Sequence, residues 1–128
     1  MLREINAVRQ NPNEPHKRWF SSASLDLVAW FDDSDVLVGF QLCYDKSSAE
    51  RAVVWRRSGQ RLEHMTVDDG ESALGKHKAS PILAASRRLP LQRVREKFLL
   101  EATELPPVIL ADVLARLDAG EAVDREDR

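Results

Sequence analysis

Residues 36–44, with the sequence VLVGFQLCY, form the longest apolar run of the chain that has the character of a β-strand. Valine, leucine and aromatic residues in such a run suit a pleated, buried surface. Candidate strands precede and follow it, so we interpret this run as the central strand of a sheet. The other elements are placed relative to it.

The segment before this run, residues 25–31, alternates apolar side chains with a mixed set, and the DDSD that follows it is typical of a turn. A four-residue turn would pair Phe31 with Val36 and Leu27 with Phe40. One side of the hairpin is then entirely apolar and also carries Leu25, Ala29, Val38 and Leu42. A slip of one residue would move these side chains to the other side, so the pattern favours this register.

A second hairpin is predicted at residues 50–67. Its SGQR turn has glycine at the first central position, which suits the type II′ turn. This turn pairs Val54 with Met65, and it places Trp55 and His64 together on the opposite side.

The two hairpins can be joined by pairing Tyr44 with Glu50. This register places Trp55 beside Gly39, so that Trp30 and Trp55 flank a residue without a side chain. We call this side of the sheet the second face, and it also carries Asp26, Gln41 and His64.

The flanking segments have weaker patterns. Leu2, Ile5 and Val8 fit either one side of a short helix or a frayed strand. Residues 16–20 fit a short strand or an extended lead-in. Residues 81–85 fit a last strand, and their proline favours a strand start or an edge.

Two helices are predicted after Pro90, which suits a first helical position. The first carries an apolar stripe at steps of three and four, made of Leu91, Val94, Phe98, Ala102 and Leu105. The prolines at 106 and 107 end it and start the second, residues 108–117, for which Gly120 is an end signal. Residues 121–128 are charged and predicted to be disordered.

The sequence therefore predicts an α+β fold, an antiparallel β-meander of about five strands with two C-terminal helices on its aliphatic face. That face is expected to hold Leu27, Phe40 and Val54. Residues 1–120 are expected to form a single domain. A function on the sheet would then lie on the second face.

The composition is that of a soluble globular protein, with 43% hydrophobic and 31% charged residues among 128. Lysine and arginine number 19 against 21 acidic residues, so the chain as a whole is not built for polyanions. The single cysteine, Cys43, excludes an internal disulfide and fits a reducing compartment. MLREINAVRQ lacks the apolar core of a secretory signal, and no apolar run spans a bilayer. We therefore expect a cytoplasmic protein.

Several segments resemble a group of short bacterial proteins to which no activity is attached. They are RWF at 18–20, DLVAW at 26–30, the GFQLCYDK strand at 39–46 and the VDDGE loop at 67–71. The resemblance covers residues 16–85 and implies a bacterial, cytoplasmic protein.

The loop at 68–78 offers two kinds of chemistry. GESALGK at 70–76 has the spacing of a phosphate-binding P-loop, with Lys76 at the lysine position. His77 stands where that motif has Ser or Thr, however, and Pro81 leaves almost no room for the helix that would bind phosphate. The pattern therefore disfavours nucleotide hydrolysis.

The same loop carries carboxylates and lies between two histidines: Asp68, Asp69 and Glu71, with His64 and His77. These side chains suit a divalent metal or a small enzyme. Their spacing matches no recognised metal site and Asp-Asp-Gly is typical of a turn, so no metal or cofactor is predicted. Cys43 and His64 are separated by a strand in the predicted register, and we assign no catalytic residue.

Two basic clusters suggest nucleic-acid binding as another alternative: Arg51, Arg56, Arg57 and Arg61, and Arg87, Arg88, Arg93, Arg95 and Lys97. Glutamates interrupt both clusters at 50, 63, 96 and 101, which is typical of a solvated charged surface.

The leading hypothesis is a non-catalytic binding domain that uses the second face to hold a small ligand or a protein partner, which includes a second copy of the chain. Its residues are Trp30, Gln41, Trp55 and His64, with the loop residues Asp68, Asp69, Glu71, Lys76 and His77. The opposing interpretation is a second layer of core, in which Trp19 and Phe20 cover this face.

Overall fold

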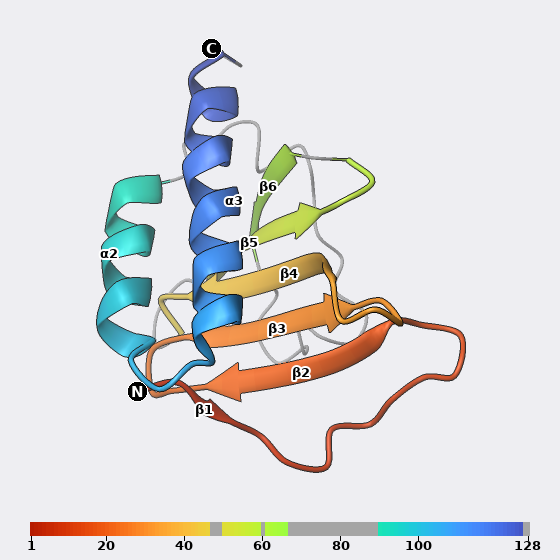
Figure 1. Ribbon diagram of the computed structural model, residues 1–128. Coiled ribbons are helices and arrows are strands. Elements are labelled where there is room, and N and C mark those ends of the chain that lie inside the picture. The colour runs from red at the N-terminus through yellow and green to blue at the C-terminus, as the bar shows by residue number, and fades with distance from the viewer. Residues whose placement is uncertain (47–49, 60, 67–89, 127–128) are drawn as a thin grey trace.

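The computed structural model describes residues 1–46, 50–59, 61–66 and 90–126 (Figure 1). In this part of the chain an antiparallel sheet of six strands has the order β1-β2-β3-β4-β5-β6, so neighbours in sequence are neighbours in space. The strands are β1 (Arg3–Glu4), β2 (His16–Ser21), β3 (Asp26–Phe31), β4 (Leu37–Tyr44), β5 (Arg51–Arg56) and β6 (Arg61–Thr66). The helices are α2 (Leu91–Glu101) and α3 (Pro107–Glu126).

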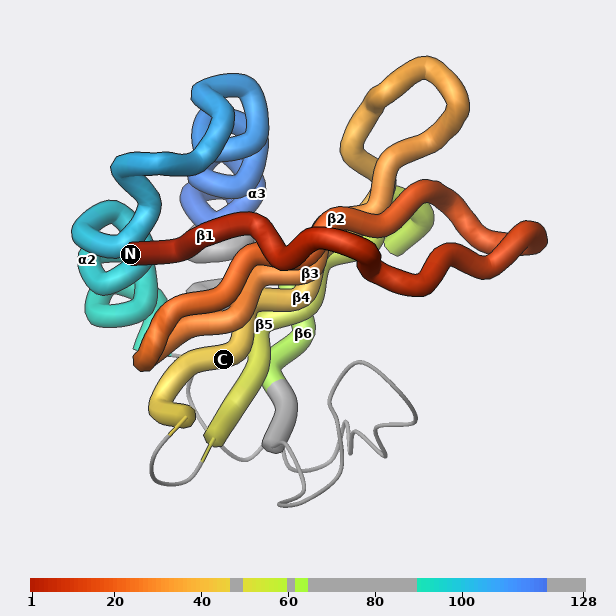
Figure 2. Tube along the Cα trace, turned by 90° about the horizontal axis from the view of Figure 1, so that it is seen from below, coloured from red at the N-terminus to blue at the C-terminus, as the bar shows by residue number. Residues whose placement is uncertain are grey.

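This architecture confirms the predicted α+β meander with two C-terminal helices. Both helices lie on one side of the sheet, which we call the helix-covered face (Figure 2). The additional strand is β1, which pairs with the end of β2 and resolves the choice between helix and strand near Leu2. Residues 81–85 lie outside the described residues.

The central strand is β4, but its pairing with β3 differs from the predicted register by two residues. Leu27 pairs with Leu42 and not with Phe40. The turn takes up more residues than expected because the Asp32 carboxylate accepts the N–H groups of Ser34 and Val36, at 2.8 and 3.0 Å. A shift of two keeps the side chains away from the turn on their faces, so the apolar side was correctly predicted for Leu27, Ala29, Phe40 and Leu42, but not for Val36 and Val38.

A β-bulge lies near this turn. Trp30 pairs with Gly39 while Phe31 pairs with Leu37, which leaves Val38 as the extra residue. The bulge turns Leu37 into the core at 3% exposure and leaves Val36 48% exposed. The predicted pairing of Phe31 with Val36 is therefore wrong.

The predicted pairing between the two hairpins is wrong by one residue. Tyr44 pairs with Arg51, and Phe40 pairs with Trp55. A one-residue difference exchanges the faces of the whole β5–β6 hairpin. Trp55 therefore lies on the helix-covered face and Val54 on the second face, where Glu63 and not Met65 pairs with Val54. This register buries the indole, the largest apolar group on β5, against the helices.

The core lies between the helix-covered face and the two helices. Its sheet members include Phe20, Leu27, Phe40, Leu42, Val53 and Trp55, and its helix members include Leu91, Val94, Phe98, Ile109, Val113 and Leu117. The α2 stripe was predicted. The predicted end of the last helix at Gly120 is wrong, because α3 continues to Glu126; a glycine inside a helix costs only about 1 kcal/mol. Within the described residues neither helix has the length and apolar character of a membrane-crossing segment.

Candidate binding site on the second face of the sheet

One row of side chains crosses the second face. Lys17 pairs with Trp30, Trp30 with Gly39, and Gly39 with Arg56. We call Lys17, Trp30, Gly39 and Arg56 the Gly39 row. Neighbouring strands lie about 4.8 Å apart, so the backbones at Trp30 and Arg56 are separated by roughly 10 Å with only a glycine between them.

A hollow of about 410 Å³ lies over this row, and we call it the second-face hollow. Its lining consists of the Gly39 row with Glu14, Pro15, Val38, Phe40, Gln41, Val54 and Trp55. The side chains of Phe40 and Trp55 lie on the other face, and the Trp55 carbonyl oxygen lies close to Gly39. The hollow therefore has an aromatic wall, a cationic wall and a floor formed partly by backbone.

Gly39 is required by this close approach. A Cβ at this position would lie 3.0 Å from the Trp55 carbonyl oxygen, which is tighter than ordinary contact. A glycine within a strand often marks such a place. The residue thus keeps the floor of the hollow flat.

Charges at the second-face hollow nearly balance. Lys17 and Arg56 are cationic, Glu14 is anionic, and Arg56 is paired with Glu63 at 3.0 Å. The side chains of this ion pair are both more than half exposed, so the pair is weak. Net charge therefore does not select the ligand.

The N-terminal loop is fixed at the rim of the hollow by one side chain. The Lys17 N–H donates to Gln10 Oε1 at 2.9 Å, and Gln10 Nε2 donates to the Lys17 carbonyl oxygen at 2.8 Å. The Gln10 side chain therefore takes up the backbone hydrogen bonds of Lys17, in the part of β2 that β1 does not pair with.

The remainder of the second face is buried. Val28, Cys43, Ala52 and Val54 are at most 4% exposed, and Gln41, also 4% exposed, places Nε2 3.6 Å from Cys43 Sγ. Burial raises the pKa of the Cys43 thiol to about 12. Trp19 lies on this face within β2, whereas Phe20 lies in the helix-side core, so Phe20 does not cover the second face.

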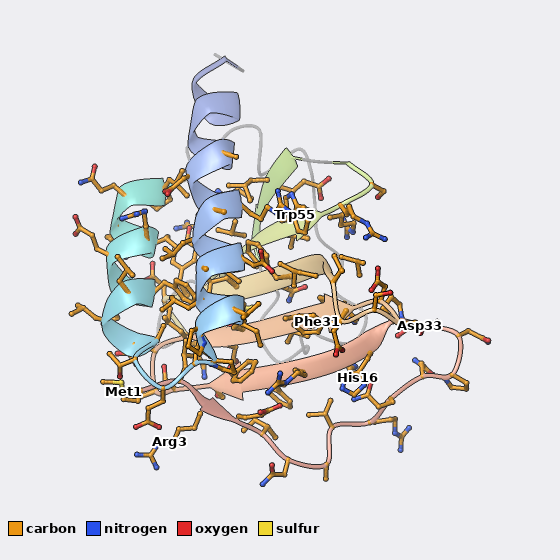
Figure 3. All side chains as sticks on the ribbon, in the orientation of Figure 1. Met1, Arg3, His16, Phe31, Asp33 and Trp55 are labelled. Carbon is orange, nitrogen blue, oxygen red and sulfur yellow. The ribbon has the colours of Figure 1, made fainter. Side chains whose placement is uncertain are left out.

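The structure brings together Trp30 and Gln41 of the predicted site, but not Trp55. The Trp55 ring stacks on Phe40, with centroids 6.1 Å apart, and lies 4.6 Å from the Arg116 guanidinium of α3. Figure 3 labels the position of Trp55. The predicted place of Trp55 on the second face is therefore wrong. The prediction missed Lys17 and Arg56. Pairing residues 16–21 with β3 and following their alternation would have placed Lys17 on the same face as Trp30.

His64 also lies on the helix-covered face. Its Nε2 is hydrogen-bonded to the Tyr44 hydroxyl, and the two rings are stacked with centroids 5.9 Å apart. Cys43 lies on the opposite face, so its thiol has no access to this imidazole. The predicted loop residues Asp68, Asp69, Glu71, Lys76 and His77 lie outside the described residues. Within the described ranges, no group of three His, Cys, Asp or Glu side chains is placed to hold a metal.

Many of the basic side chains in the described ranges are paired individually. The pairs are Arg56 with Glu63, Arg57 with Asp32, Arg93 with Asp45 and Arg95 with Asp118. Pairing of this kind favours a mixed charged surface over a continuous basic one.

In comparisons with known proteins, no family model, no curated protein and no solved structure matches the chain.

Proposed function

We propose that the protein is a non-catalytic binding domain that holds a flat ring over Gly39 in the second-face hollow. The ring belongs to a small ligand or to a side chain of a partner. The observation that carries the proposal is the Gly39 row, in which an indole and a guanidinium stand on either side of a position without a side chain.

The spacing of the row supports a flat ring. Roughly 10 Å separates the two flanking backbones, and a ring in van der Waals contact on both sides needs about 7 Å. Trp and Arg are the two side chains that stack most readily on planar groups.

A binding role is also supported by the chemistry of the lining. Its charged groups are Glu14, Lys17 and Arg56, and no histidine, cysteine or serine stands among the described residues that line it. The single cysteine is a buried free thiol, which supports our proposal of a reducing, cytoplasmic setting.

The experiment is a titration of the isotope-labelled protein with indole, adenine and benzamide, followed by amide chemical shifts. We expect at least one of these rings to shift the amides of Gly39, Gln41 and Val54. Trp30→Ala should abolish the shifts and Trp30→Phe should retain part of them. Arg56→Gln should weaken binding severalfold, whereas Arg57→Gln, which removes the neighbouring charge paired with Asp32, should not.

A second copy of the chain is the other occupant to test. If it fills the hollow, the native protein elutes as a dimer and Trp30→Ala elutes as a monomer. The proposal is overturned if no ring shifts these amides and Trp30→Ala leaves the oligomeric state unchanged.

A further inference from the structure

A second hollow, of about 400 Å³, lies on the helix side of the molecule. It is bounded by the turn at residues 22–25, the end of β4 and one side of α2, and we call it the α2 hollow. Its lining is Ala23, Ser24, Leu25, Tyr44, Asp45, Lys46, Arg93, Val94 and Lys97. It shares no residue with the second-face hollow.

Three cations and a single carboxylate line the α2 hollow. Lys46 is satisfied within the protein, because its Nζ donates to the Ser22 carbonyl oxygen at 2.8 Å and to Asp26 at 3.1 Å. Arg93 donates two hydrogen bonds to Asp45, both at 3.1 Å. Lys97 acts electrostatically on Asp45 and Glu101, but these carboxylates are already paired with Arg93 and with the N-terminal ammonium. Among the described residues, the rim therefore has one positive charge more than its paired carboxylates balance.

The arrangement of Arg93 and Lys97 adds to this excess. They lie four residues apart on α2, which places two like charges one helical turn apart on the same side. Such a pair of like charges is unfavourable, and Asp45 is the one carboxylate of the described lining that acts on both. Arg93, Arg51 and Lys97 all lower the pKa of Asp45, so three cations act on the same carboxylate.

A further cation, Arg51, lies beside Tyr44, although it does not line the α2 hollow. It pairs with Tyr44 across β4 and β5, and its Nε is buried without an acceptor. A buried donor of this kind normally has a partner in the protein, in solvent or in a ligand.

We propose that the α2 hollow binds a phosphate group carried on a small apolar moiety. The donors are the Lys97 ammonium, the N–H groups of Arg93 that Asp45 does not use, and the Ser24 hydroxyl, which makes no hydrogen bond to a described residue. They come from the turn at residues 22–25 and from α2, and a set of several separate donors suits the three oxygens of a phosphate group better than the two oxygens of a carboxylate.

The apolar part of the ligand follows from the rest of the lining. Ala23 is exposed and the stems of Arg93 and Lys97 add further carbon surface, with the buried Leu25 and Val94 beneath them; the volume exceeds that of inorganic phosphate alone. Asp45 opposes an anion, but its charge is already held by Arg93.

The test is isothermal titration of the whole chain with phenyl phosphate, inorganic phosphate and benzoate at constant ionic strength. We expect phenyl phosphate to bind more tightly than inorganic phosphate. Lys97→Gln should weaken phenyl phosphate binding about five- to tenfold, the loss of one charge-assisted hydrogen bond at a partly exposed site. Lys97 is exposed, so this variant should melt at the native temperature in chloride.

Arg95→Gln is the matched control. It removes one positive charge from the same helix, but Arg95 is paired with Asp118 of α3 at 2.7 Å and does not line the hollow. Phenyl phosphate affinity should be unchanged in this variant. The proposal is overturned by no binding of phenyl phosphate, by equal losses in Lys97→Gln and Arg95→Gln, or by benzoate binding as tightly as phenyl phosphate.

Discussion

Gly39 shows how a single residue without a side chain defines both the floor of a hollow and the fit of two strands. The Cβ added by Gly39→Ala would press on the Trp55 carbonyl oxygen 3.0 Å away. Because backbone in a central strand moves little, we expect this substitution to lower the free energy of unfolding by about 1–3 kcal/mol, as measured in urea.

Gly59→Ala is the comparison, because a Cβ there meets no atom within 4 Å. It should change the free energy of unfolding by less than about 1 kcal/mol. Equal effects of the two substitutions would contradict the assigned role of Gly39.

Cys43 is predicted to be unreactive in the folded protein. Burial raises the pKa of its thiol from 9.0 to about 12, so at pH 8 only about one molecule in 10⁴ carries a thiolate. Alkylation by iodoacetamide at pH 8 should be far slower in the native protein than in urea. Equal rates in the two states would show that the thiol is accessible.

Burial of Cys43 and Tyr44 also makes stability depend on alkaline pH. Burial raises the pKa of Tyr44 from 10.0 to about 12, and both raised values mean that the folded state holds these protons more tightly. The stabilisation is complete below pH 9.0 and is lost as pH rises towards 12. Each group contributes a loss of about 1.4 kcal/mol per pH unit above its unfolded pKa.

Urea unfolding at pH 8, 9 and 10 measures this dependence, and Cys43→Ala serves as the control. The substitution should reduce the fall between pH 9 and 10 and leave the fall caused by Tyr44. An unchanged fall in Cys43→Ala would exclude the thiol as its source.

At the scale of the elements, the two hairpins show what alternation along a strand can predict and what it cannot. Within each hairpin the faces away from the turn were correct, because an error of two residues in the turn leaves the alternation intact; Val36 and Val38, beside the bulge, are the exceptions. Between the hairpins the error was one residue, at a connection where Asp45 adopts a left-handed φ of 57°. Nothing in the sequence of that connection marks this conformation, since the left-handed region is usually occupied by glycine.

The same error explains how much of the site was predicted. Trp30, Gly39 and Gln41 lie on β3 and β4, whose faces were correct, so they remain together on the second face. Trp55 and His64 lie on the hairpin whose faces are exchanged, so both moved to the helix-covered face. The second face carries Val54 and Arg56 instead. Apolar residues alternate on both sides of β5, so the pattern of hydrophobicity does not tell which side faces the helices.

Trp55 and Trp30 should therefore respond differently to truncation. Trp55 is 5% exposed within the core, and Trp55→Ala should lower the free energy of unfolding by about 3–5 kcal/mol. Trp30 is half-buried beside the second-face hollow, and Trp30→Ala should lower it by only about 1 kcal/mol. Urea denaturation of both variants decides this, and a larger loss in Trp30→Ala would contradict the register of β5.

At the scale of the whole molecule, the start of the chain connects the sheet to the helical layer. Leu2 is fully buried in the core, and its N–H donates to the Glu101 carbonyl oxygen at the end of α2 at 2.7 Å. The next residues pair with β2 as β1. Leu2 therefore contacts both layers at the edge of the sheet.

Leu2→Ala should lower the free energy of unfolding by about 2–4 kcal/mol, because a buried leucine leaves a cavity between the two layers. Ile5→Ala, at a position 38% exposed, should lower it by less than about 1 kcal/mol. Thermal and urea unfolding of the two variants provide the comparison; losses of equal size would mean that Leu2 does not join the layers.

The position of β4 in the sheet has a consequence for the opening motions of the folded protein. β4 is paired on both sides along most of its length, and six of its eight residues are at most 4% exposed. Its amide hydrogens can exchange with solvent only when the sheet comes apart, whereas those of β1 can exchange by fraying. Hydrogen exchange at Phe40 and Leu42 therefore reports the free energy of global opening in water, without any denaturant.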